Sequence, residues 1–261
     1  MLMLKNLKRK AKVTSIENVC RKVGILIKDS FLFWYPKVKD LPIPQPKTEV
    51  VLLTKKELRV LYCERVCESV VEKVRGACER VGYPCFLRTD LASAKHSWKH
   101  SCFIDGCKGL EEHILNIVSF NLCADIMGLD FKAFVVREFI PMDTRFTAFH
   151  GDTPINPERR YFIKNGRVLC HHPYWIEDAI EQVERIKSPS IQNWREVLKE
   201  INTETEEEIA LLTNYAEIVA KQFDGYWSID FCRAKDGRWI LVDMATGERS
   251  WHPKCGELPH P

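Results

Sequence analysis

The last two apolar runs of the sequence constrain its fold more than any other feature. YWSIDFC (226–232) and RWILVDM (238–244) have the composition of strands and are separated by a short segment that contains Asp-Gly. A two-residue Asp-Gly turn joins such strands into an antiparallel hairpin. Residues at equal distances from the turn then face each other, so this hairpin sets Asp230 directly opposite Asp243.

Two aspartates placed in this way need a compensating charge. Cross-strand neighbours have Cβ atoms about 5 Å apart, and like charges at that separation repel. By alternation, Trp239 and Leu241 share the face of Asp243, which predicts that the face is covered. Mg²⁺ is a hard cation that takes one or two carboxylates and completes its octahedron with water and phosphate oxygens, and we expect it here. The alternative is that both carboxylates point into solvent.

Helices and strands follow one another irregularly along the rest of the chain. Apolar residues recur at helical spacing in 55–81, 110–127, 175–186, 192–200 and 204–222. Apolar runs bounded by turn residues predict further strands at 85–90, 101–104, 131–140, 145–150, 159–163 and 166–171. This order favours an α+β fold with mostly antiparallel hairpins over the strict alternation of a doubly wound sheet.

Two segments lack a regular period. Residues 1–35 mix basic and apolar positions, and prolines from Pro36 to Pro46 predict an extended, poorly helical surface strap after them. Residues 91–101, LASAKHSWKHS, join two predicted strands, and their small and basic residues indicate a mobile, positively charged loop.

Cations interrupt several predicted strands. The chain contains neither G-x-x-x-x-G-K-[ST] nor G-x-G-x-x-G, which counts against a P-loop NTPase, a protein kinase or a dinucleotide-binding fold. Instead, Arg88 lies in an apolar strand, Lys95 lies in the loop after it, and Arg145 opens another strand. Arg159 and Arg160 are adjacent, and alternation predicts that only one of them points inward.

The order of four segments resembles a known superfamily. FLRTDLASAK, FVVREFIP, ERRYFIKNGRVLCHHPYW and SIDFCRAKDGRWILVDMATG are similar to the ATP-grasp superfamily over about residues 40–255, and specifically to a divergent branch in which two arginines and a lysine replace the usual nucleotide-binding set. The resemblance implies two α+β lobes with mostly antiparallel sheets and ATP bound between them.

The resemblance also implies a division of the chain. Residues 1–48 would form a basic segment and strap on the substrate side, and residues 49–261 the ATP-grasp region. Within that region, 49–135 would be the first lobe with the phosphate loop, and 136–261 the second lobe with the metal site.

Individual site residues follow from the same resemblance. It implies that Arg88 and Lys95 contact the ATP phosphates, with Lys95 on a loop that closes over them. Arg160 would contact the γ-phosphate or a phosphorylated intermediate, which makes Arg160 and Lys95 the catalytic cations. Asp230 and Asp243 would hold Mg²⁺, in independent agreement with the register of the hairpin.

A hinge after one strand is implied as the site of the adenine base. Residues 135–140 would bind the base through their backbone, with Glu138 near the ribose. The hinge residues expected to contact the cofactor are Val136, Arg137, Glu138 and Phe139.

The sequence departs from the superfamily at the metal site. Members usually carry an asparagine two positions after the second acidic ligand, and Ala245 occupies that position here. Only Thr246 or a water could replace it. The second ligand is also an aspartate rather than the commoner glutamate, which favours one metal ion over two.

The resemblance implies an ATP-dependent carboxylate–amine ligase. A carboxylate attacks the γ-phosphate, cations offset the charge on the transferred group, and an amine then attacks the acyl phosphate. No protein nucleophile is required. The substrate, small or a peptide or protein, would be held by the N-terminal segment and by His171, His172, Tyr174 and Trp175, although these four could equally be packing residues.

Two other classes of function remain open. One is a nucleotide-binding assembly factor without ligase turnover, which the Ala245 departure would tolerate. The other is a nucleic-acid or nucleotide end-processing enzyme. The formal net charge of +3 does not imply a nucleic-acid partner, and neither a K-x-D-G motif nor an aromatic stacking platform accompanies the basic loop.

Composition predicts a cytoplasmic protein. No apolar run approaches the ~18 residues of a membrane span, and no apolar segment follows the basic N-terminus as in a signal peptide. The 11 cysteines form no paired C-x-x-C clusters, and we interpret them as buried thiols. His252, Cys255 and His260 are the weak tail candidates for zinc. Substrate identity and oligomeric state stay open.

Overall fold

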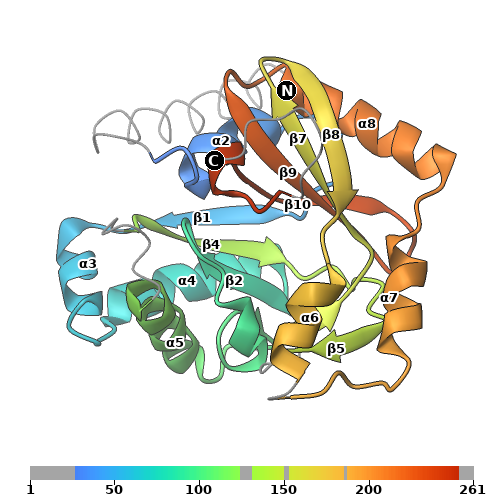
Figure 1. Cartoon of the computed structure of the whole chain (residues 1–261). Helices are drawn as coiled ribbons and strands as arrows, with labels where there is room; N and C mark the ends of the chain where they lie inside the picture. The colour runs from blue at the N-terminus through green and yellow to red at the C-terminus, as the bar shows by residue number, and fades with distance from the viewer. Residues whose placement is uncertain (1–26, 124–130, 150–152, 185–186, 253–261) are drawn as a thin grey trace.

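Two four-stranded sheets organise the molecule (Figure 1). The computed structural model describes residues 27–123, 131–149, 153–184 and 187–252. All strand pairs in the two sheets are antiparallel within these residues. Helices cover both sheets, and the α+β class with mostly antiparallel sheets is therefore confirmed.

The first sheet lies in the N-terminal half. Its strands, in spatial order, are β1 (Thr48–Leu52), β4 (Ala133–Glu138), β2 (Cys85–Thr89) and β3 (Phe103–Ile104). The helices α4 (Glu68–Val81) and α5 (Leu110–Cys123) pack on one face of this sheet (Figure 1). The strands predicted at 85–90, 101–104 and 131–140 correspond to β2, β3 and β4. The helix predicted at 110–127 is described as far as Cys123, and residues 124–130 lie outside the described residues.

Alternation along the strands gives the first sheet two different faces. Phe134 and Val136 point toward α4 and α5 and belong to the core beneath them. Val135 belongs to the other core, on the side of the second sheet. Arg137 shares the face of Val135 by alternation, and Arg88 pairs directly with Val135. Both arginines therefore face the second sheet.

The second sheet carries the C-terminal hairpin. Its strands, in spatial order, are β10 (Trp239–Thr246), β9 (Tyr226–Arg233), β7 (Glu158–Lys164) and β8 (Arg167–Pro173). The helices α2 (Phe31–Val38) and α8 (Glu206–Ala220) complete its core, which contains Ile229 and Phe231. The opposite face of this sheet is turned toward the first sheet and its arginines, Arg88 and Arg137.

A third, smaller core lies beside the second sheet. It is formed by β5 (Phe146–Ala148), β6 (Thr153–Ile155), α6 (Glu177–Glu184) and α7 (Trp194–Asn202). The helices α6, α7 and α8 confirm the three helices predicted from 175 onward. The sequence did not predict β6, which is three residues long and contains Pro154.

The single helix predicted over 55–81 is wrong. The structure has α3 (Lys55–Leu61) and α4, with Glu64 between them at a left-handed φ of 55°. Glu57 of α3 accepts hydrogen bonds from Ser69 and from Lys73 of α4, the latter at 2.6 Å. In one continuous helix, residues 16 apart would be separated by about 24 Å. The buried Glu57 carboxylate thus fixes the fold-back.

The extended strap predicted after residue 35 is also partly wrong, because α2 runs through Pro36. Ser30 caps the helix by accepting a hydrogen bond from the Leu32 amide. The residues Phe31, Trp34 and Val38 are buried at helical spacing. Pro36 is tolerated because packing of this face outweighs the one hydrogen bond that its missing N–H removes from a short helix.

The loop predicted at 91–101 contains a short 3-10 helix, η1 (Lys95–His100). Ala94 precedes it in a left-handed conformation, with φ of 44°. Ser101 donates a hydrogen bond to the Ala94 carbonyl at 2.9 Å, which holds the two ends of the segment together. The position of Lys95 is therefore set by a defined turn.

Some expectations concern residues that the structure does not describe. Residues 1–26 of the expected N-terminal segment, and the zinc candidates Cys255 and His260, lie outside the described residues. Among the helices that are described, none combines the length and the apolar character needed to cross a membrane.

Candidate functional site

One row of four residues crosses the face of the second sheet that is turned toward the first sheet. Asp243 of β10 pairs with Asp230 of β9, Asp230 with Arg160 of β7, and Arg160 with His172 of β8. The predicted opposition of the two aspartates is confirmed. Because cross-strand partners share a face, the row brings two carboxylates, a guanidinium and an imidazole together.

The register that produces this row differs from the predicted one in two places. The turn is one residue longer than predicted, because Ala234 and Arg238 pair through a backbone hydrogen bond and residues 235–237 form the loop. A bulge at Val242 then shifts the pairing back by one residue. The two shifts cancel at Asp243, which is why the prediction is correct there.

The bulge also reverses the face that was expected to carry Asp243. Leu241 pairs with Phe231, whereas Asp243 pairs with Asp230, so the two β10 side chains point to opposite faces. Leu241 and Trp239 lie in the buried core of the second sheet. The expectation that they share a face with Asp243 was therefore wrong, and Asp243 faces the first sheet instead.

Arg160 and Asp230 form a two-pronged ion pair within this row. The Arg160 Nε and Nη2 atoms donate to the two carboxylate oxygens of Asp230, each at 2.8 Å. Their side chains are 13% and 10% exposed. Such bidentate pairs fix the orientation of both partners, so the two groups hold one geometry at the edge of the space between the sheets.

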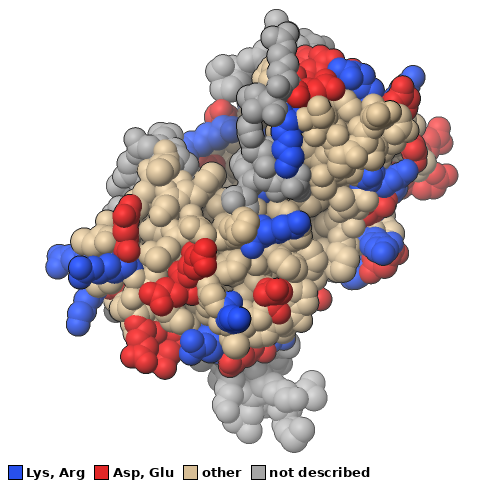
Figure 2. All heavy atoms as spheres, turned by 90° about the horizontal axis from the view of Figure 1, so that it is seen from below, with Lys and Arg blue, Asp and Glu red and all other residues tan. Residues whose placement is uncertain are grey.

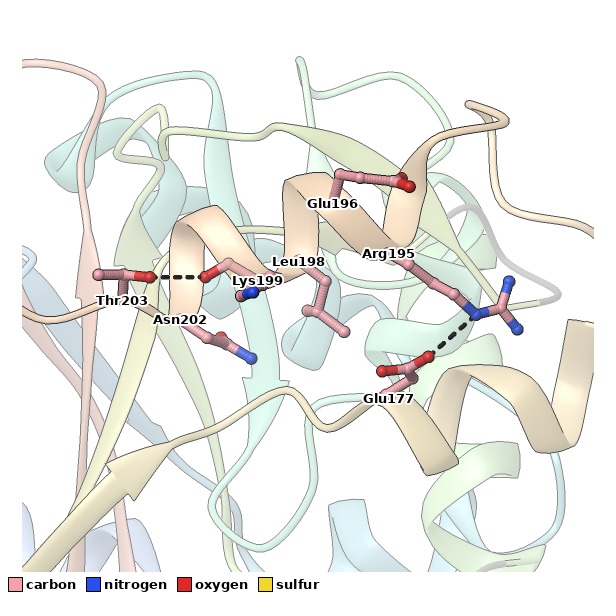
Figure 3. Close-up of a pocket in the computed structure, with 7 residues that line it drawn as sticks. All are labelled: Glu177, Arg195, Glu196, Leu198, Lys199, Asn202 and Thr203. Carbon is pink, nitrogen blue, oxygen red and sulfur yellow. Dashed lines mark hydrogen bonds and ion pairs between the residues drawn. The ribbon is translucent and has the colours of Figure 1, made fainter.

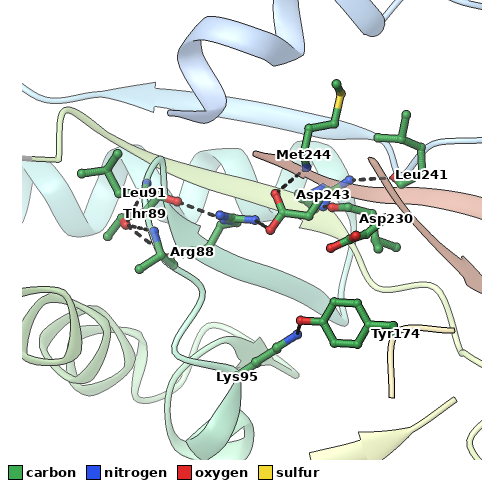
Figure 4. A network of polar contacts seen from close by, with 12 residues as sticks. Arg88, Thr89, Leu91, Lys95, Tyr174, Asp230, Leu241, Asp243 and Met244 are labelled. Atoms are coloured by element: carbon green, nitrogen blue, oxygen red, sulfur yellow. Dashed lines mark hydrogen bonds and ion pairs between the residues drawn. The ribbon is translucent and has the colours of Figure 1, made fainter. Parts of the chain in front are cut away.

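A second ion pair joins the two sheets. The Arg88 Nη1 atom of β2 donates to Asp243 Oδ2 of β10 at 3.0 Å (Figure 4). The Arg88 side chain is 7% exposed, whereas that of Asp243 is 41% exposed. Burial opposes ionisation of Asp243, but the nearby Arg88 guanidinium lowers the pKa of this carboxyl below its usual value. Asp243 is thus an ionised carboxylate open to solvent.

Arg137 supports the bulge from the first sheet. Its Nη1 atom donates to the carbonyl of Val242, and Nη2 donates to the carbonyl of Leu241 at 3.4 Å. These carbonyls belong to the bulged segment, where the regular ladder is interrupted. Burial, together with the proximity of Arg88, lowers the pKa of Arg137 to about 10. The Arg137 side chain therefore stabilises the bulge that turns Asp243 toward the first sheet.

Lys95 reaches the same space from η1. Its ammonium group donates to the Tyr174 hydroxyl at 3.3 Å and lies 5.0 Å from the centre of the Tyr174 ring (Figure 4). Burial favours the neutral amine, but Tyr174 and Glu158 outweigh it and raise the pKa of Lys95. Arg160 lies over the same ring at 4.6 Å. Two cations from different sheets thus meet at one aromatic side chain.

Glu158 is a site residue that the sequence reasoning missed. It lies on β7 two residues before Arg160, and so on the same face, and it is 7% exposed. Burial raises its pKa to about 7, with Lys95 acting in the opposite direction. The alternation that separates Arg159 from Arg160 could have found Glu158 as well, because it places Glu158 on the face of Arg160.

The hinge residues lie at the end of β4, in differing surroundings. Val136 is buried in the first core. The exposed Glu138 accepts a hydrogen bond from the Lys47 amide at 3.1 Å. Phe139 lies parallel to Trp98 with ring centres 6.2 Å apart, and Phe103 makes edge contact with Phe139 at 4.8 Å. An aromatic cluster therefore adjoins the hinge beside η1.

The paired arginines lie on opposite faces of β7, as alternation predicts, but both side chains are largely covered, so the expectation that only one of them points inward was wrong. Arg159 is 1% exposed and lies on the opposite face of β7, where its Nε atom is 2.7 Å from Glu208 and 3.1 Å from Glu204. His171 joins this group through Glu204 at 3.2 Å. Glu208 lies in the first turn of α8 and Glu204 just before it. The start of this helix therefore covers Arg159 and supplies the negative charges that compensate the buried guanidinium group.

The residues of the segment HHPYW (171–175) contact different parts of the structure. The His172 Nδ1 atom donates to the Pro173 carbonyl at 2.7 Å, and burial lowers the pKa of His172 to about 4, so the ring is neutral. Trp175 lies in the third core. His172 and Tyr174 of the segment thus share the space that holds Arg160, and the Trp175 ring borders it at 5.6 Å from the Lys95 ammonium group.

Thr246 has another partner than a metal ion. Its hydroxyl donates to Asp29 Oδ1 at 2.7 Å and its amide donates to the same oxygen at 2.6 Å. Thr246 pairs with Trp227 of β9, whose side chain lies in the core of the second sheet, so Thr246 lies on the opposite face of β10 from Asp243. Of the two substitutes considered for the missing third ligand, this leaves a water. Within the described ranges, no group of three or more His, Cys, Asp or Glu side chains is arranged to hold a metal ion.

A separate pocket of about 550 Å³ opens between α6 and α7 (Figure 3). Its lining includes Glu177, Arg195 and Lys199, and Arg195 is paired there with Glu177 at 2.9 Å. None of the residues that line it belongs to the row on the second sheet. The pocket is thus distinct from the charged space between the sheets.

Comparison with known proteins places the chain in a family. A model described as ATP-grasp domain, R-2-K clade family 3, matches residues 79–258. No curated protein matches the sequence.

Solved structures agree with the family match. C-terminally truncated Cdc123 from Schizosaccharomyces pombe is similar with a TM-score of 0.54 and 16% identity, over 85% of this chain and 86% of that chain. A second structure of Cdc123 from the same organism has a TM-score of 0.53 and 14% identity, over 85% and 87%. An Aspergillus clavatus N5-carboxyaminoimidazole synthase in complex with ADP has a TM-score of 0.47 and 11% identity, over 83% and 43%.

The family model covers more than half of the chain, and the two-sheet architecture is that of the similar structures. The chain belongs to the ATP-grasp superfamily, in the clade family that this model describes.

Proposed function

We propose that this protein binds Mg-ATP between its two sheets and acts as an ATP-dependent carboxylate–amine ligase. The observation that carries the proposal is the convergence of three cations, Arg88, Lys95 and Arg160, on the face that carries Asp230 and Asp243. Polyphosphate and a divalent cation need these opposite charges at one place.

The ion pairs of this site support the assignment. Asp243 pairs with Arg88, and Asp230 pairs with Arg160. Each pair contains one group suited to phosphate and one suited to a metal ion. Mg-ATP would offer a partner to both members of each pair, because its phosphates match the guanidinium groups and its metal ion matches the carboxylates. Neither component alone would do so.

The donor set fits Mg²⁺. Asp230 and Asp243 would hold the ion through carboxylate oxygens, and phosphate and water oxygens would complete its octahedron, as Mg²⁺ usually requires. When bound, Mg²⁺ supplies neutralisation of the charge that develops on the transferred phosphoryl group.

The chain's own cations would stabilise the transfer step. Lys95 and Arg160 lie beside one ring and would contact the γ-phosphoryl group, while Arg88 would hold the neighbouring phosphates. The substrate carboxylate attacks phosphorus, the bond to ADP breaks, and an acyl phosphate forms. The amine then attacks the acyl carbon, phosphate leaves, and an amide results. The cations act by electrostatic stabilisation of charge on the phosphoryl oxygens.

The base would lie against the hinge that follows β4. Residues 136 and 137 pair with strands on both sides, so in this proposal the backbone at the end of β4, residues 138–139, binds adenine and Glu138 approaches the ribose. The parallel rings of Phe139 and Trp98 provide an apolar border on the η1 side. The expected first lobe (49–135) and second lobe (136–261) would then meet at this hinge, although β4 itself runs on to Glu138.

A nucleotide-binding assembly factor without turnover is the second candidate. It is favoured by Ala245 at the usual third-ligand position and by the placement of Thr246 on the face of β10 opposite to Asp243. Both features reduce the ligand set at the metal site to two carboxylates. An end-processing enzyme finds no comparable support: positive and negative side chains are interspersed on the face shown in Figure 2.

Two measurements separate the candidates. Calorimetric titration with Mg-ATP tests binding, and phosphate release in the presence of a library of carboxylates and amines tests turnover. A ligase releases phosphate only when a carboxylate and an amine are both present, and Asp243→Asn should abolish this release. Tight Mg-ATP binding with no release for any pair would favour the assembly factor. Absence of Mg-ATP binding would refute both.

A further inference from the structure

The Tyr174 side chain contacts two of the proposed phosphate-binding cations at once. Its hydroxyl accepts a hydrogen bond from Lys95 at 3.3 Å, and its ring has Lys95 at 5.0 Å and Arg160 at 4.6 Å from its centre. Lys95 comes from the loop of the first sheet and Arg160 from a central strand of the second. The tyrosine therefore links the two sheets at the charged space.

We propose that Tyr174 is a positioning residue that holds Lys95 and Arg160 together as one clamp for the transferred phosphoryl group. This inference rests on the proposed function, because it assigns to Tyr174 a role in the same site. Tyr174 acts through the two cations and does not itself need to contact the phosphate.

Electrostatics explains why the two cations need such a residue. Like charges repel, and in a partly water-excluded space the repulsion is screened less than in bulk water. The face of an aromatic ring carries negative charge density and attracts cations within about 6 Å of its centre. A ring that contacts both cations offsets their repulsion, and so keeps them close before the phosphate arrives.

The surroundings hold Tyr174 in place for this task. Its amide donates to the Glu158 carbonyl at 2.9 Å, which fixes the backbone beside β7. Its ring makes edge contact with Trp175 at 4.9 Å, and Trp175 is 8% exposed in the third core. The ring thus stands on a buried support.

Lys95 gains the most from this contact. It is the first residue of the 3-10 helix η1 and follows Ala94, whose left-handed backbone is unusual for a residue with a side chain. Its long side chain loses rotamer freedom when it is ordered. The Tyr174 hydroxyl and ring give the ammonium group a fixed place, so that less of this cost falls on nucleotide binding.

A double-mutant cycle on the full-length protein tests the inference, with Mg-ATP affinity measured by calorimetry. Tyr174→Leu removes the ring and the hydroxyl, whereas Tyr174→Phe keeps the ring. We expect Tyr174→Leu to weaken binding by about tenfold and Tyr174→Phe by no more than about threefold. In the Lys95→Ala background, Tyr174→Leu should weaken binding by less than about threefold, because its main partner is already gone. Tyr215→Leu, at a partly buried tyrosine on α8, is the control and should leave the affinity unchanged.

The outcomes are distinct. Full additivity of Tyr174→Leu and Lys95→Ala would overturn the positioning role, since a residue that only packs would weaken binding independently of Lys95. An unchanged affinity in Tyr174→Leu, with weakened binding in Lys95→Ala, would overturn this inference and leave the proposed function intact. Unchanged affinity in both Lys95→Ala and Arg160→Ala would instead refute the proposed phosphate site itself.

Discussion

Arg159 and Arg160 are neighbours in sequence and lie on opposite faces of the same strand. Arg159 is enclosed beneath α8 with Glu204 and Glu208, and all three side chains are at most 15% exposed. Arg160 pairs with Asp230 on the face that looks toward the first sheet, where the Asp243 side chain of the same row is 41% exposed. The difference between the two arginines lies in what covers each face.

This contrast separates an ion cluster that serves stability from one that is open to a ligand. The Arg159 cluster is closed by a helix that brings its own counter-charges, so nothing remains to be bound. The Arg160 row faces the first sheet and Lys95 of η1 instead, and its ion pairs join β7, β9, β10 and the first sheet. Charge type alone would not distinguish the two.

The largest expected effect is on the closed side. Arg159→Ala leaves Glu204 and Glu208 buried without their cation, and we expect it to lower the free energy of unfolding by about 3–5 kcal/mol. Urea denaturation measures this loss. Should Arg159→Ala fail to fold, Arg159→Lys, which keeps the charge and loses the fork, should show a smaller loss. A change in unfolding free energy within experimental error would contradict the claim that the Arg159 cluster stabilises the fold.

The second effect is on the open side. Arg160→Ala should weaken Mg-ATP binding by about 100-fold, because a charge-assisted contact to the phosphate and the orientation of Asp230 are lost together. Calorimetry at fixed ionic strength measures the affinity. Arg238→Ala is a matched control, since its partner Asp236 lies in the exposed hairpin loop, and it should bind Mg-ATP as the wild type does. Equal Mg-ATP affinity of Arg160→Ala and the wild type would contradict the claim that Arg160 contacts the nucleotide.

A third effect concerns pH and Glu158. Burial raises the pKa of this carboxyl from 4.5 to about 7. Between those values the folded protein keeps a proton that the unfolded chain has lost, so stability falls as pH rises through this window. Glu158→Gln removes the effect, and its advantage in unfolding free energy over the wild type should grow by roughly 1–3 kcal/mol from pH 4.5 to 7 and then level off. A difference that stays constant over this range would contradict the assignment.

The smallest effect tests whether the ion pairs compete with the ligand. Asp243→Asn frees Arg88 from its carboxylate, so ATP without metal, in the presence of a chelator, should bind about threefold to tenfold more tightly than to the wild type. Added Mg²⁺ should then improve binding less than it does for the wild type. Weaker binding of metal-free ATP to the variant would show that Asp243 does not restrain Arg88.

The sequence predicted the aspartate pair of the site better than the turn and the bulge that flank it. The apposition of Asp230 and Asp243 was predictable, because strand alternation and a short turn constrain a hairpin strongly. The longer turn and the bulge at Val242 were not, and their offsets cancel at this one pair. A bulge depends on tertiary contacts, here the Arg137 guanidinium on the carbonyls of Leu241 and Val242.

Other features depended on partners remote in the chain. The break between α3 and α4 follows from contacts of Ser69 and Lys73 with Glu57, which no local periodicity reveals. The burial of Arg159 required knowing that α8 covers its face. Helical order through Pro36 likewise required the core that α2 joins. Local pattern sets which residues share a face, whereas tertiary packing decides what lies opposite that face.

The most direct test of the account is a crystal structure of the full chain with Mg²⁺ and a non-hydrolysable ATP analogue. We expect the triphosphate to contact Arg88, Lys95 and Arg160, and the metal ion to lie on the carboxylates of Asp230 and Asp243. The adenine should lie against residues 138–139. A nucleotide bound elsewhere, with the Arg88–Asp243 and Arg160–Asp230 pairs unchanged, would contradict the claim that this row is the nucleotide site.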